Sequence, residues 1–514
     1  MLSYLYIIVC SLCGIILLHK PIALLQQGSY RIKGNRGLLR ELLYISIIFC
    51  VIEAVALVIL FCGYDYIIAV INMVFLVVMS SFMRAQRLKV TLKYTPRAMR
   101  LVSLTIAINI LNTTVLLLIN SLFRTNKLIY CLASTEIILS NISLIVAKCI
   151  LAPFEKRNND RYIDNAKNTL KSLPSVDVIG ITGSFGKTSI KNILYHILSA
   201  KFNVVMTKAS YNTPLGVAIS VGELTGQEDF FIVEMGARRL GDISYLVGMT
   251  HPKYGIISGI TEQHIETMGN IESIAKAKYE LYEGIPDDGL CVFNSRNEIS
   301  IQMYNYANKD NAILSYNNMC NISDIVLGGD GSSFVLNIDG ASRICRTSLL
   351  GRHNIDNIAM CVTLAYALGM NIDEIALGIS AIEPIEHRLE LIAENGINII
   401  DDTYNANIKG VESALELLSM CNGRKIVATQ GIVECGKKEH SINKKVGNMI
   451  ASCADIVVVI GRNARYILEG LLESGFSSQN IFTVSNLEKA KAVFSALLRK
   501  GDYLLLTNDL PDNY

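Results

Sequence analysis

The stretch that most restricts the fold is VIGITGSFGKTS, residues 178–189. Its β-branched apolar residues lead into a turn with two glycines, Gly183 and Gly186, and then into Lys187 and Thr188. Apolar residues follow at the helical period, at Ile190, Ile193, Leu194, Ile197 and Leu198. A strand, a glycine turn and a helix N-terminus form a cradle for phosphate, because free backbone N–H groups and the helix dipole attract an anion. The stretch therefore predicts a nucleotide-binding loop.

The residues of this loop have separate expected roles. Lys187 would reach the outer phosphates of a nucleotide, and the Thr188 hydroxyl would bind Mg²⁺. The backbone that surrounds the phosphates would come from Gly183, Ser184 and Gly186. The strict motif has glycine where Ile181 stands, and here the first glycine comes one place early, at Gly180. The alternative is a glycine turn with a solvated lysine, but the strand before the turn and the helix after it favour nucleotide binding.

Composition indicates a chain with a membrane-embedded part. The 514 residues are enough for about three domains. Apolar residues make up 51% and charged residues only 18%, which is an apolar excess for a wholly soluble protein. The net charge of +2 gives no basic field for binding nucleic acid. The 13 cysteines show no metal-binding or disulfide spacing, since the only C-x-x-C pair, Cys10 and Cys13, lies in an apolar run.

Residues 1–152 predict an α-helical membrane domain. Five apolar stretches there each approach the roughly 20 residues that span a bilayer. They lie at about 2–18, 42–62, 66–83, 101–122 and 128–151. The first has no charged segment before it and no small-residue cleavage site, so we interpret it as a membrane helix rather than a signal peptide.

Lysine and arginine residues predict how these spans are oriented. They gather between the first and second spans and between the third and fourth, whereas the other two connections are short. By the positive-inside rule, the N-terminus is expected outside the plasma membrane. Everything after residue 152 is expected in the cytoplasm, where ATP is found.

Glu53, Glu136 and Lys148 are ionisable residues within the predicted spans. Because such residues are costly in lipid, they are candidates for function. Lys148 can extend to the cytoplasmic interface. For Glu136 we expect interhelical hydrogen bonds rather than contact with a lipid headgroup or a substrate.

The remainder of the chain alternates strand and helix patterns after a charged connecting helix at 153–170, which is typical of parallel α/β sheets. The expected strands are 178–181, 204–206, 230–233, 254–260 and 291–293. Ligands bind at the carboxyl ends of such strands, and the third ends in Glu234, a carboxylate suited to Mg²⁺. A smaller α/β domain is predicted by further strands at 397–400, 426–429, 456–460, 481–484 and 503–506.

Several long motifs resemble the ATP-dependent Mur ligases, and most closely the MurF type, which adds D-Ala-D-Ala to a peptidoglycan precursor. They are GITGSFGKTS at 180–189, YNTPLG at 211–216, EMGA at 234–237, GRHNIDN at 351–357 and DDTYNAN at 401–407. His264 and Lys278 have the spacing of that family's His…Ala-Lys pair. The resemblance covers residues 175–440. It implies a central ATP-binding domain at 153–384 and a Rossmann-like C-terminal domain at 385–514.

The resemblance implies a reaction in which ATP converts a carboxylate into an acyl phosphate, which an amine then attacks to give an amide, ADP and phosphate. It implies that Lys187 lies at the β- and γ-phosphates. It also implies one Mg²⁺ held by Thr188 and Glu234, and a second held by His264 with a carbamylated Lys278. Carbamylation turns a cationic amine into an anionic oxygen ligand, which a hard metal prefers.

The resemblance also implies residues around the substrates. Asn354 and Asn357, three apart on one helix face, would contact adenine, although the same motif can mark an ordinary helix start. Arg388 and Asp402 would contact ATP across the cleft between the two ligase domains. The expected substrate-binding residues are Asn212, Thr213, Tyr404, Asn405 and Asn407.

The chain departs from the MurF pattern at both ends. After ECG, His440 comes earlier than the family's histidine, and Asn443 stands near the position where that histidine is expected. The family's amine-binding pocket therefore cannot be assigned to this chain from the motif alone. Membrane spans stand where the family has a small domain that binds the UDP end of the precursor. We therefore expect a cell-wall precursor, UDP-linked or lipid-linked, as the acyl substrate, an amino acid or dipeptide as the amine, and lipid around the spans.

Other functions remain open. The same core could serve another polymer, such as a poly-amino-acid chain. A transporter ATPase would share the spans and the phosphate loop, but it would leave His264, Lys278 and the Asn-x-x-Asn motif unexplained. A degenerate nucleotide-binding scaffold would not keep the phosphate and metal positions filled. The sequence therefore favours a membrane-anchored ligase of cell-wall synthesis.

Overall fold

The computed structural model divides the chain into two compact units, the first ending at Asp160 and the second beginning at Arg161. It describes residues 2–28, 30, 32, 35–61, 65–85, 91–123, 135–261, 268–307, 310–329, 331–404, 407–433, 435, 438–461 and 463–507. The two units are described separately below. The predicted domain limits at residues 152 and 384 stay predictions.

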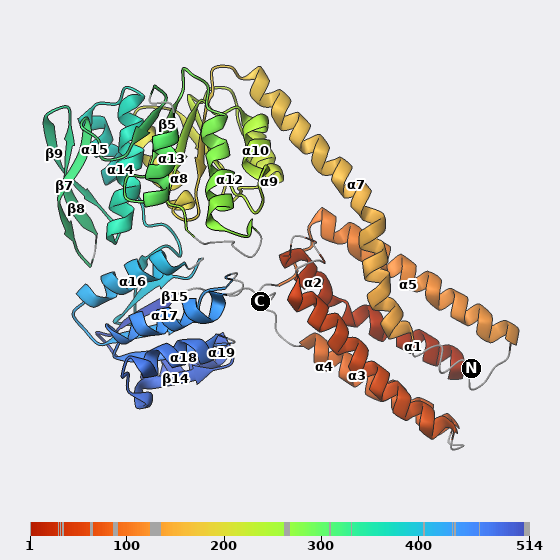
Figure 1. The fold of residues 1–514 in the computed structure, drawn as a ribbon. Coiled ribbons are helices and arrows are strands. Elements are labelled where there is room, and N and C mark those ends of the chain that lie inside the picture. The colour runs from red at the N-terminus through yellow and green to blue at the C-terminus, as the bar shows by residue number, and fades with distance from the viewer. Residues whose placement is uncertain are drawn as a thin grey trace. The chain divides into compact units, whose positions relative to one another are not determined.

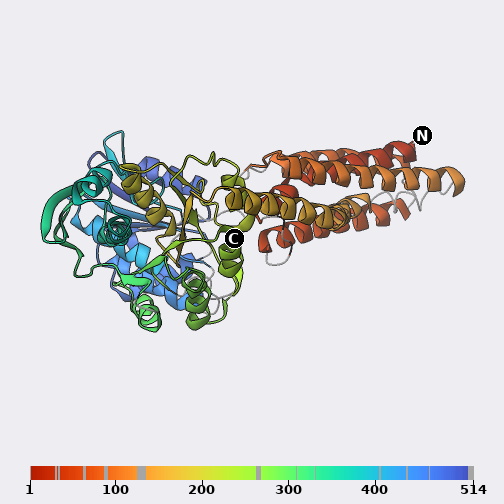
Figure 2. The same ribbon diagram turned by 90° about the horizontal axis from the view of Figure 1, so that it is seen from above.

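The first unit consists of helices (Figures 1 and 2). Helix α1 packs against both α4 and α5, and α3 packs against α2 and α4. The helices are α1 (Leu2–Leu17), α2 (His19–Gln27), α3 (Arg36–Phe61), α4 (Asp65–Ala85), α5 (Pro96–Phe123) and the first part of α7 (Glu136–Ser172).

Three helical segments among the described residues are long and apolar enough to cross a membrane: Ser3–Gln27, Pro96–Leu122 and Glu136–Ser172. They overlap the predicted spans at 2–18, 101–122 and 128–151. The predicted spans at 42–62 and 66–83 coincide with α3 and α4. A membrane crossing by these two helices, and hence the total of five, stays a prediction.

Polarity in this unit is reversed relative to a water-soluble bundle. Polar side chains lie inside and bond between helices: Thr113 Oγ1 donates to Ser11 Oγ at 2.7 Å, and Ser140 Oγ donates to Asn109 Oδ1 at 2.6 Å. Large apolar side chains are exposed on the outer faces, including Leu12, Ile47, Val74, Leu111, Leu122 and Ile150. This arrangement is the one expected of helices surrounded by lipid.

The interhelical hydrogen bonds expected of Glu136 are not found among the described residues. The side chain is fully buried, and among the described residues neither carboxylate oxygen has a hydrogen-bond partner. The bonds between helices are made instead by its neighbours Ser140 and Asn109, because their shorter side chains meet across the α5–α7 contact. The side chain of Glu53 lies outside the described residues, and Lys148 is half-buried.

Helix α7 continues without a break from Glu136 to Ser172, so the predicted fifth span and the connecting helix are one element. Pro153 lies inside it and removes one backbone hydrogen bond. Ion pairs hold the helix just beyond this point: Glu155 lies 3.5 Å from Arg97 and 2.8 Å from Arg100. Packing and charge therefore outweigh the local effect of the proline.

The second unit begins with a six-stranded parallel sheet in the order β2-β3-β1-β4-β5-β6. Its strands are β1 (Asp177–Thr182), β2 (Val204–Met206), β3 (Phe230–Glu234), β4 (Tyr254–Ile257), β5 (Leu290–Phe293) and β6 (Ala312–Leu314). The five predicted strands are confirmed, and β6 adds a short edge. Since parallel strands join through crossover helices, both faces become covered.

Alternate residues of the strands enter different cores. Ile179 and Ile181 pack under α8, α14 and α15, whereas Val178 packs with α9, α10, α12 and α13 on the opposite face. The helices are α8 (Lys187–Ser199), α9 (Pro214–Val221), α10 (Asp242–Thr250), α12 (Ile271–Glu283), α13 (Glu298–Tyr306), α14 (Arg352–Ala367) and α15 (Ile372–Ser380).

Strand β4 ends at Ile257, three residues before its predicted end. The next residues leave the sheet to support the glycine turn: Gly259 O accepts from Ser184 N at 2.8 Å. A Cβ on Gly259 would lie only 1.9 Å from Cζ of the Phe185 ring, so this position has no room for a side chain. A contact that is distant in sequence therefore shortens the strand.

A three-stranded antiparallel sheet was not predicted. It consists of β7 (Cys320–Leu327), β8 (Ser332–Ile338) and β9 (Ala341–Thr347). In β8, buried and half-buried residues alternate over its whole length. In the sequence the corresponding signal is the apolar residues Phe334, Leu336 and Ile338 at every second position, although Val335 between them is also apolar.

The C-terminal part contains a second six-stranded sheet, in the order β10-β11-β15-β12-β13-β14. All its strands are parallel except β10, which pairs antiparallel to β11. The strands are β10 (Glu390–Glu394), β11 (Ile397–Asp402), β12 (Lys425–Thr429), β13 (Ile456–Ile460), β14 (Ile481–Val484) and β15 (Tyr503–Thr507). Helices α16 (Ile408–Met420), α17 (Glu439–Ala451) and α18 (Ala464–Glu473) cover one face, and α19 (Leu487–Leu497) covers the other.

Asp502, before the last strand, makes a bidentate pair with Arg424, at 3.1 Å to Nε and 2.6 Å to Nη2. Burial opposes ionisation of Asp502, but hydrogen bonds from Arg424 and from the Arg499 backbone outweigh it, so its pKa lies below the ordinary 3.8. A depressed folded-state pKa contributes stability above the unfolded pKa, and this stability is lost as the pH falls through the folded value.

We therefore expect Asp502→Asn to lower the free energy of unfolding by about 2 kcal/mol at pH 7, and by less below about pH 4. Thermal unfolding followed by circular dichroism measures the difference. The exposed Asp288, which pairs with Lys253 at 3.5 Å, gives a matched control, because Asp288→Asn should change little. An equal effect of Asp502→Asn at pH 3 and pH 7 would contradict the prediction.

Candidate nucleotide and metal site

The two glycines of the turn have positive φ angles, which residues with a Cβ rarely adopt. Gly183 has φ 151° and Gly186, the residue before α8, has φ 78°. A Cβ on Gly183 would lie 1.8 Å from Ser258 Oγ. Helix α8 begins at Lys187, as predicted, so its free N–H groups face the turn. Strand, turn and helix start thus have the arrangement of a phosphate-binding loop.

Lys187 folds back over this turn. Its Nζ donates to Gly183 O at 2.7 Å and to Ser184 O at 3.3 Å. Burial lowers the pKa of the ammonium; Glu234 opposes this effect and Arg388 adds to it. The amino group of Lys187 is therefore held at the mouth of the loop, where phosphate oxygens would be bound.

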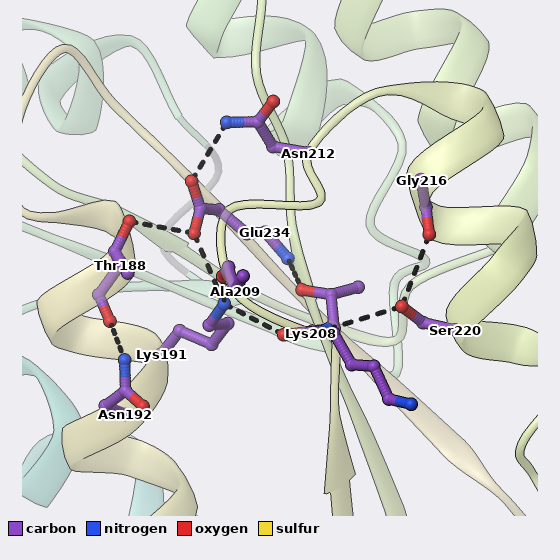
Figure 3. Close-up of polar contacts among 10 residues, drawn as sticks. Thr188, Lys191, Asn192, Lys208, Ala209, Asn212, Gly216, Ser220 and Glu234 are labelled. Atoms are coloured by element: carbon purple, nitrogen blue, oxygen red, sulfur yellow. Dashed lines mark hydrogen bonds and ion pairs between the residues drawn. The ribbon is translucent and has the colours of Figure 1, made fainter. Parts of the chain in front are cut away.

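The carboxylate of Glu234, at the end of β3, lies next to the start of α8 (Figure 3). Its Oε2 accepts a hydrogen bond from Thr188 Oγ1 at 3.0 Å, and its Oε1 accepts one from Asn212 Nδ2 at 3.0 Å. The register of β1 and β3, with Ile181 opposite Glu234, brings these groups to one edge of the sheet. A hydroxyl and a buried carboxylate are hard oxygen donors, so the pair fits Mg²⁺.

Lys278 lies on α12 and is 3% exposed. Burial lowers its pKa from the ordinary 10.5 to about 7; Lys187 adds to this, whereas Asp242 and Glu280 oppose it. The two lysines therefore share one electrostatic environment. The predicted partner His264 lies outside the described residues, as does Asn405.

Asn354 and Asn357 share the buried face of α14. Asn357 Nδ2 donates to Asn354 Oδ1 at 3.3 Å, and Asn354 Nδ2 donates to Leu350 O at 2.9 Å. Asn357 Oδ1 also lies 3.1 Å from the position of a Cβ on Gly186, so the helix contacts the glycine turn. Beside them, Nδ1 of His353 is buried and has no hydrogen-bond partner among the described residues.

Arg388 belongs to the connection between the two ligase sheets. Its guanidinium lies over the ring of Tyr404, 4.3 Å from the centroid, and its Nε is buried without a partner among the described residues. Burial raises the pKa of Asp402 to about 6, although Arg388 opposes this. The residues on both sides of Arg388 have positive φ, 61° at His387 and 50° at Leu389. The backbone is thus strained where it presents this arginine.

Two predicted substrate residues serve as helix caps. Thr213 precedes α9 and accepts from Gly216 N at 3.4 Å, and Asn407 precedes α16 and accepts from Gly410 N at 3.0 Å. Each side chain satisfies a free N–H group of its helix. Their roles toward a substrate stay predictions.

Asn443, which stands near the family's histidine position, is fully buried. It accepts from Ile432 N at 2.8 Å and donates to Ile432 O at 2.9 Å. Its side chain therefore holds the loop after β12. His440 is half exposed and pairs with Glu469 at 2.7 Å.

Lys191 was not predicted to be a site residue, although its side chain lies next to Thr188 and Glu234 (Figure 3). It lies one helical turn after Lys187, among the apolar residues of the buried face of α8. A lysine on such a face is the signal that could have indicated it.

Two regions of the chain match known domain families. Residues 181–365 match the Mur ligase middle domain, and residues 387–508 match the Mur ligase glutamate ligase domain. Among individual proteins, the chain is 28% identical to the UDP-N-acetylmuramoyl-tripeptide–D-alanyl-D-alanine ligase of Escherichia coli over 297 residues, 56% of this chain and 66% of that one. The Bacillus subtilis enzyme of the same name is also 28% identical, over 66% of this chain and 74% of its own. The chain thus spans just under two thirds of the E. coli relative.

Solved structures show the same fold. MurF from Acinetobacter baumannii superimposes with a TM-score of 0.63 at 24% identity, over 68% of this chain and 77% of that one. MurF from Thermotoga maritima in complex with ADP gives a TM-score of 0.61 at 23% identity, over 68% and 80%.

Proposed function

This chain belongs to the Mur ligase family of ATP-dependent ligases, and we propose that it is a membrane-anchored member that forms an amide bond on a cell-wall precursor, as MurF does. The observation that supports this proposal is the site beside the glycine turn and Lys187, in which Glu234 contacts Thr188 and Asn212. The relatives named above are ligases of UDP-N-acetylmuramoyl-tripeptide and D-alanyl-D-alanine. For this chain both substrates are part of the proposal.

The residues of the site account for the first half of the reaction. A carboxylate must approach the γ-phosphate of ATP although both are negative, so cations must offset the repulsion. Lys187 supplies one fixed positive charge at the loop. Thr188 and Glu234 would hold Mg²⁺, which supplies charge neutralisation at the phosphates when it is bound. The carboxylate oxygen attacks phosphorus, ADP leaves, and the amine then displaces phosphate from the acyl carbon.

Lys278 would hold a second metal ion after carbamylation. Only a neutral amine reacts with carbon dioxide, and a pKa of about 7 leaves a large neutral fraction at physiological pH. Burial also protects the carbamate from water. We assign His264 to the same metal ion, by resemblance to the family.

Adenine would bind beside α14. The buried Nδ1 of His353 and Nε of Arg388 each lack a partner among the described residues, and a buried polar atom normally has one. A nucleotide could satisfy both. Asp402 and Tyr404 lie with Arg388 and would take part in closing the site around ATP, which keeps water from the acyl phosphate.

Phosphate release tests the activity and identifies the acyl substrate. The full chain in detergent is given ATP, Mg²⁺ and D-Ala-D-Ala, with UDP-MurNAc-tripeptide in one arm and the same muramoyl tripeptide on a lipid carrier in the other. We expect phosphate only when acyl substrate and amine are both present. Preference for the lipid-linked arm is the result that the apolar first unit favours. Release that depends on neither substrate would refute the assignment.

We also propose that the ligase unit faces the cytoplasm from a multi-pass membrane unit. In inverted membrane vesicles, added protease should digest the ligase unit of the full-length chain, and in right-side-out vesicles it should not. Carbonate washing should leave the chain in the membrane fraction. Digestion only in right-side-out vesicles would reverse the orientation, and extraction by carbonate would refute the anchor.

A further inference from the structure

Lys191 is a buried cation that the reaction scheme above leaves unused. Its side chain is 1% exposed, on the inner face of α8. Burying an ammonium is costly unless hydrogen bonds and an opposite charge compensate it. The position of Lys191 therefore calls for a role that a smaller apolar residue could not fill.

The ammonium group of Lys191 is surrounded by oxygens (Figure 3). It donates to Thr207 O at 2.8 Å and also to Ala209 O, and it lies 3.5 Å from Glu234 Oε2. Two backbone carbonyls and a carboxylate form a donor set that also suits a small monovalent cation. The Nζ of Lys191 thus occupies a site whose oxygens suit a cation.

The two carbonyls belong to the segment that carries Asn212. Ala209 has φ 41°, a left-handed conformation that is strained for a residue with a Cβ, and the bond from Lys191 holds its carbonyl there. Thr207 Oγ1 accepts from the backbone N of Glu234 at 3.1 Å. One ammonium group therefore links α8, the segment after β2 and the end of β3.

The carboxylate of Glu234 is consequently fixed at both oxygens. Asn212 bonds Oε1, whereas Thr188 and Lys191 contact Oε2. A metal ion held by Thr188 and Glu234 would replace the hydrogen bond between them. Asn212 and Lys191 are then the neighbours that keep the carboxylate oriented.

We propose that Lys191 is a positioning residue for the metal site: it orients Glu234 directly and, through Ala209 O, holds the segment of Asn212. The inference rests on the proposed function only in that Glu234 binds Mg²⁺. Partners that orient metal ligands typically change metal affinity about 10- to 100-fold when they are lost. A competing possibility is that Lys191 merely repels the metal, in which case its removal would tighten Mg²⁺ binding.

The test uses the full chain in detergent and measures the Mg²⁺ concentration that gives half-maximal binding of a non-hydrolysable ATP analogue. Lys191→Met retains most of the side-chain volume and removes the charge, and we expect it to raise this concentration about tenfold. Lys208→Met is the matched control. Lys208 belongs to the same segment, but its side chain is 57% exposed and pairs with Glu223, so the Mg²⁺ requirement should stay within about twofold.

Chemical rescue separates positioning from general support of the fold. Lys191→Ala leaves a space for n-propylammonium, which has the missing carbons and the ammonium donors. We expect this cation to restore Mg²⁺-dependent nucleotide binding to Lys191→Ala, whereas tetramethylammonium, which has no N–H donor, should not. Melting temperatures of both variants, measured with and without the amine, report on folding.

The proposal would be overturned by an unchanged Mg²⁺ requirement in Lys191→Met, by a lower requirement, or by no rescue of Lys191→Ala by n-propylammonium. Failure of both variants to fold, uncorrected by the amine, would assign Lys191 to the core alone and equally overturn it. The proposed ligase activity is tested separately. A wild-type chain that binds Mg²⁺ and nucleotide but joins no substrates would refute that activity and leave the role of Lys191 intact.

Discussion

Lys187→Met is expected to lower kcat/KM for ATP about 10³-fold, with the fold retained. Methionine keeps the length of the side chain but brings no positive charge to the phosphates. In the described structure the ammonium of Lys187 is held only by carbonyls of the turn, Gly183 O and Ser184 O, which a phosphate can replace. Initial rates of phosphate release at several ATP concentrations measure the effect.

The control for this change is Lys201→Met. Lys201 follows α8 and bonds Gly369 O at 2.8 Å and Glu374 Oε2 at 3.1 Å, outside the glycine turn. It should leave kcat/KM for ATP within about twofold, because exposed pairs of this kind contribute little. If Lys187→Met retained more than about a tenth of the wild-type kcat/KM, the glycine turn would not be the phosphate site.

Lys278→Ala is expected to reduce kcat about 10³-fold, because the second metal ion would lose an anionic ligand. Formate or acetate should restore part of the activity by supplying a carboxylate in place of the carbamate. In the wild type, activity should fall when carbon dioxide is removed and should rise as the pH passes upward through about 7, where the amine becomes neutral. Carbon-13 NMR of protein given labelled bicarbonate detects the carbamate directly.

Lys276 supplies the comparison for Lys278. It lies on the same helix, α12, but its side chain is exposed and takes no part in the site. Lys276→Ala should retain full activity and give no response to formate. Full activity of Lys278→Ala, or the absence of a carbamate signal in the active wild type, would remove the proposed role of Lys278.

Local sequence signals were enough for the elements that line the site. Strand β1, the glycine turn and the start of α8 followed from twelve adjacent residues, 178–189, and the structure has them at these positions. The same holds for β2, β3 and β5 of the first parallel sheet and for β11 to β15 of the C-terminal sheet, whereas β6 and β10 were not predicted. Apolar periodicity and turn residues act between near neighbours in the chain, so they can be read without knowledge of the fold.

Features that depend on distant contacts could not be derived in this way. The early end of β4 follows from its contact with the glycine turn, and α7 continues through Pro153 where Glu155 is held by arginines of α5. The burial of the Glu136 carboxylate depends on how the helices of the first unit pack. In each case a partner remote in sequence outweighs the local preference.

The sequence by itself determined that this chain has an apolar helical part and a strand, glycine turn and helix with the motifs of a Mur ligase. The tertiary structure decided how the loop residues are used. Glu234 contacts Thr188, Asn212 and Lys191 at one sheet edge because the parallel register of β1 and β3 and the path of the segment after β2 bring them there. Their sequence separations of up to 46 residues carry no local signal. The lysine on the apolar face of α8 can be seen in the sequence, but only the packing shows that its ammonium group lies beside Glu234.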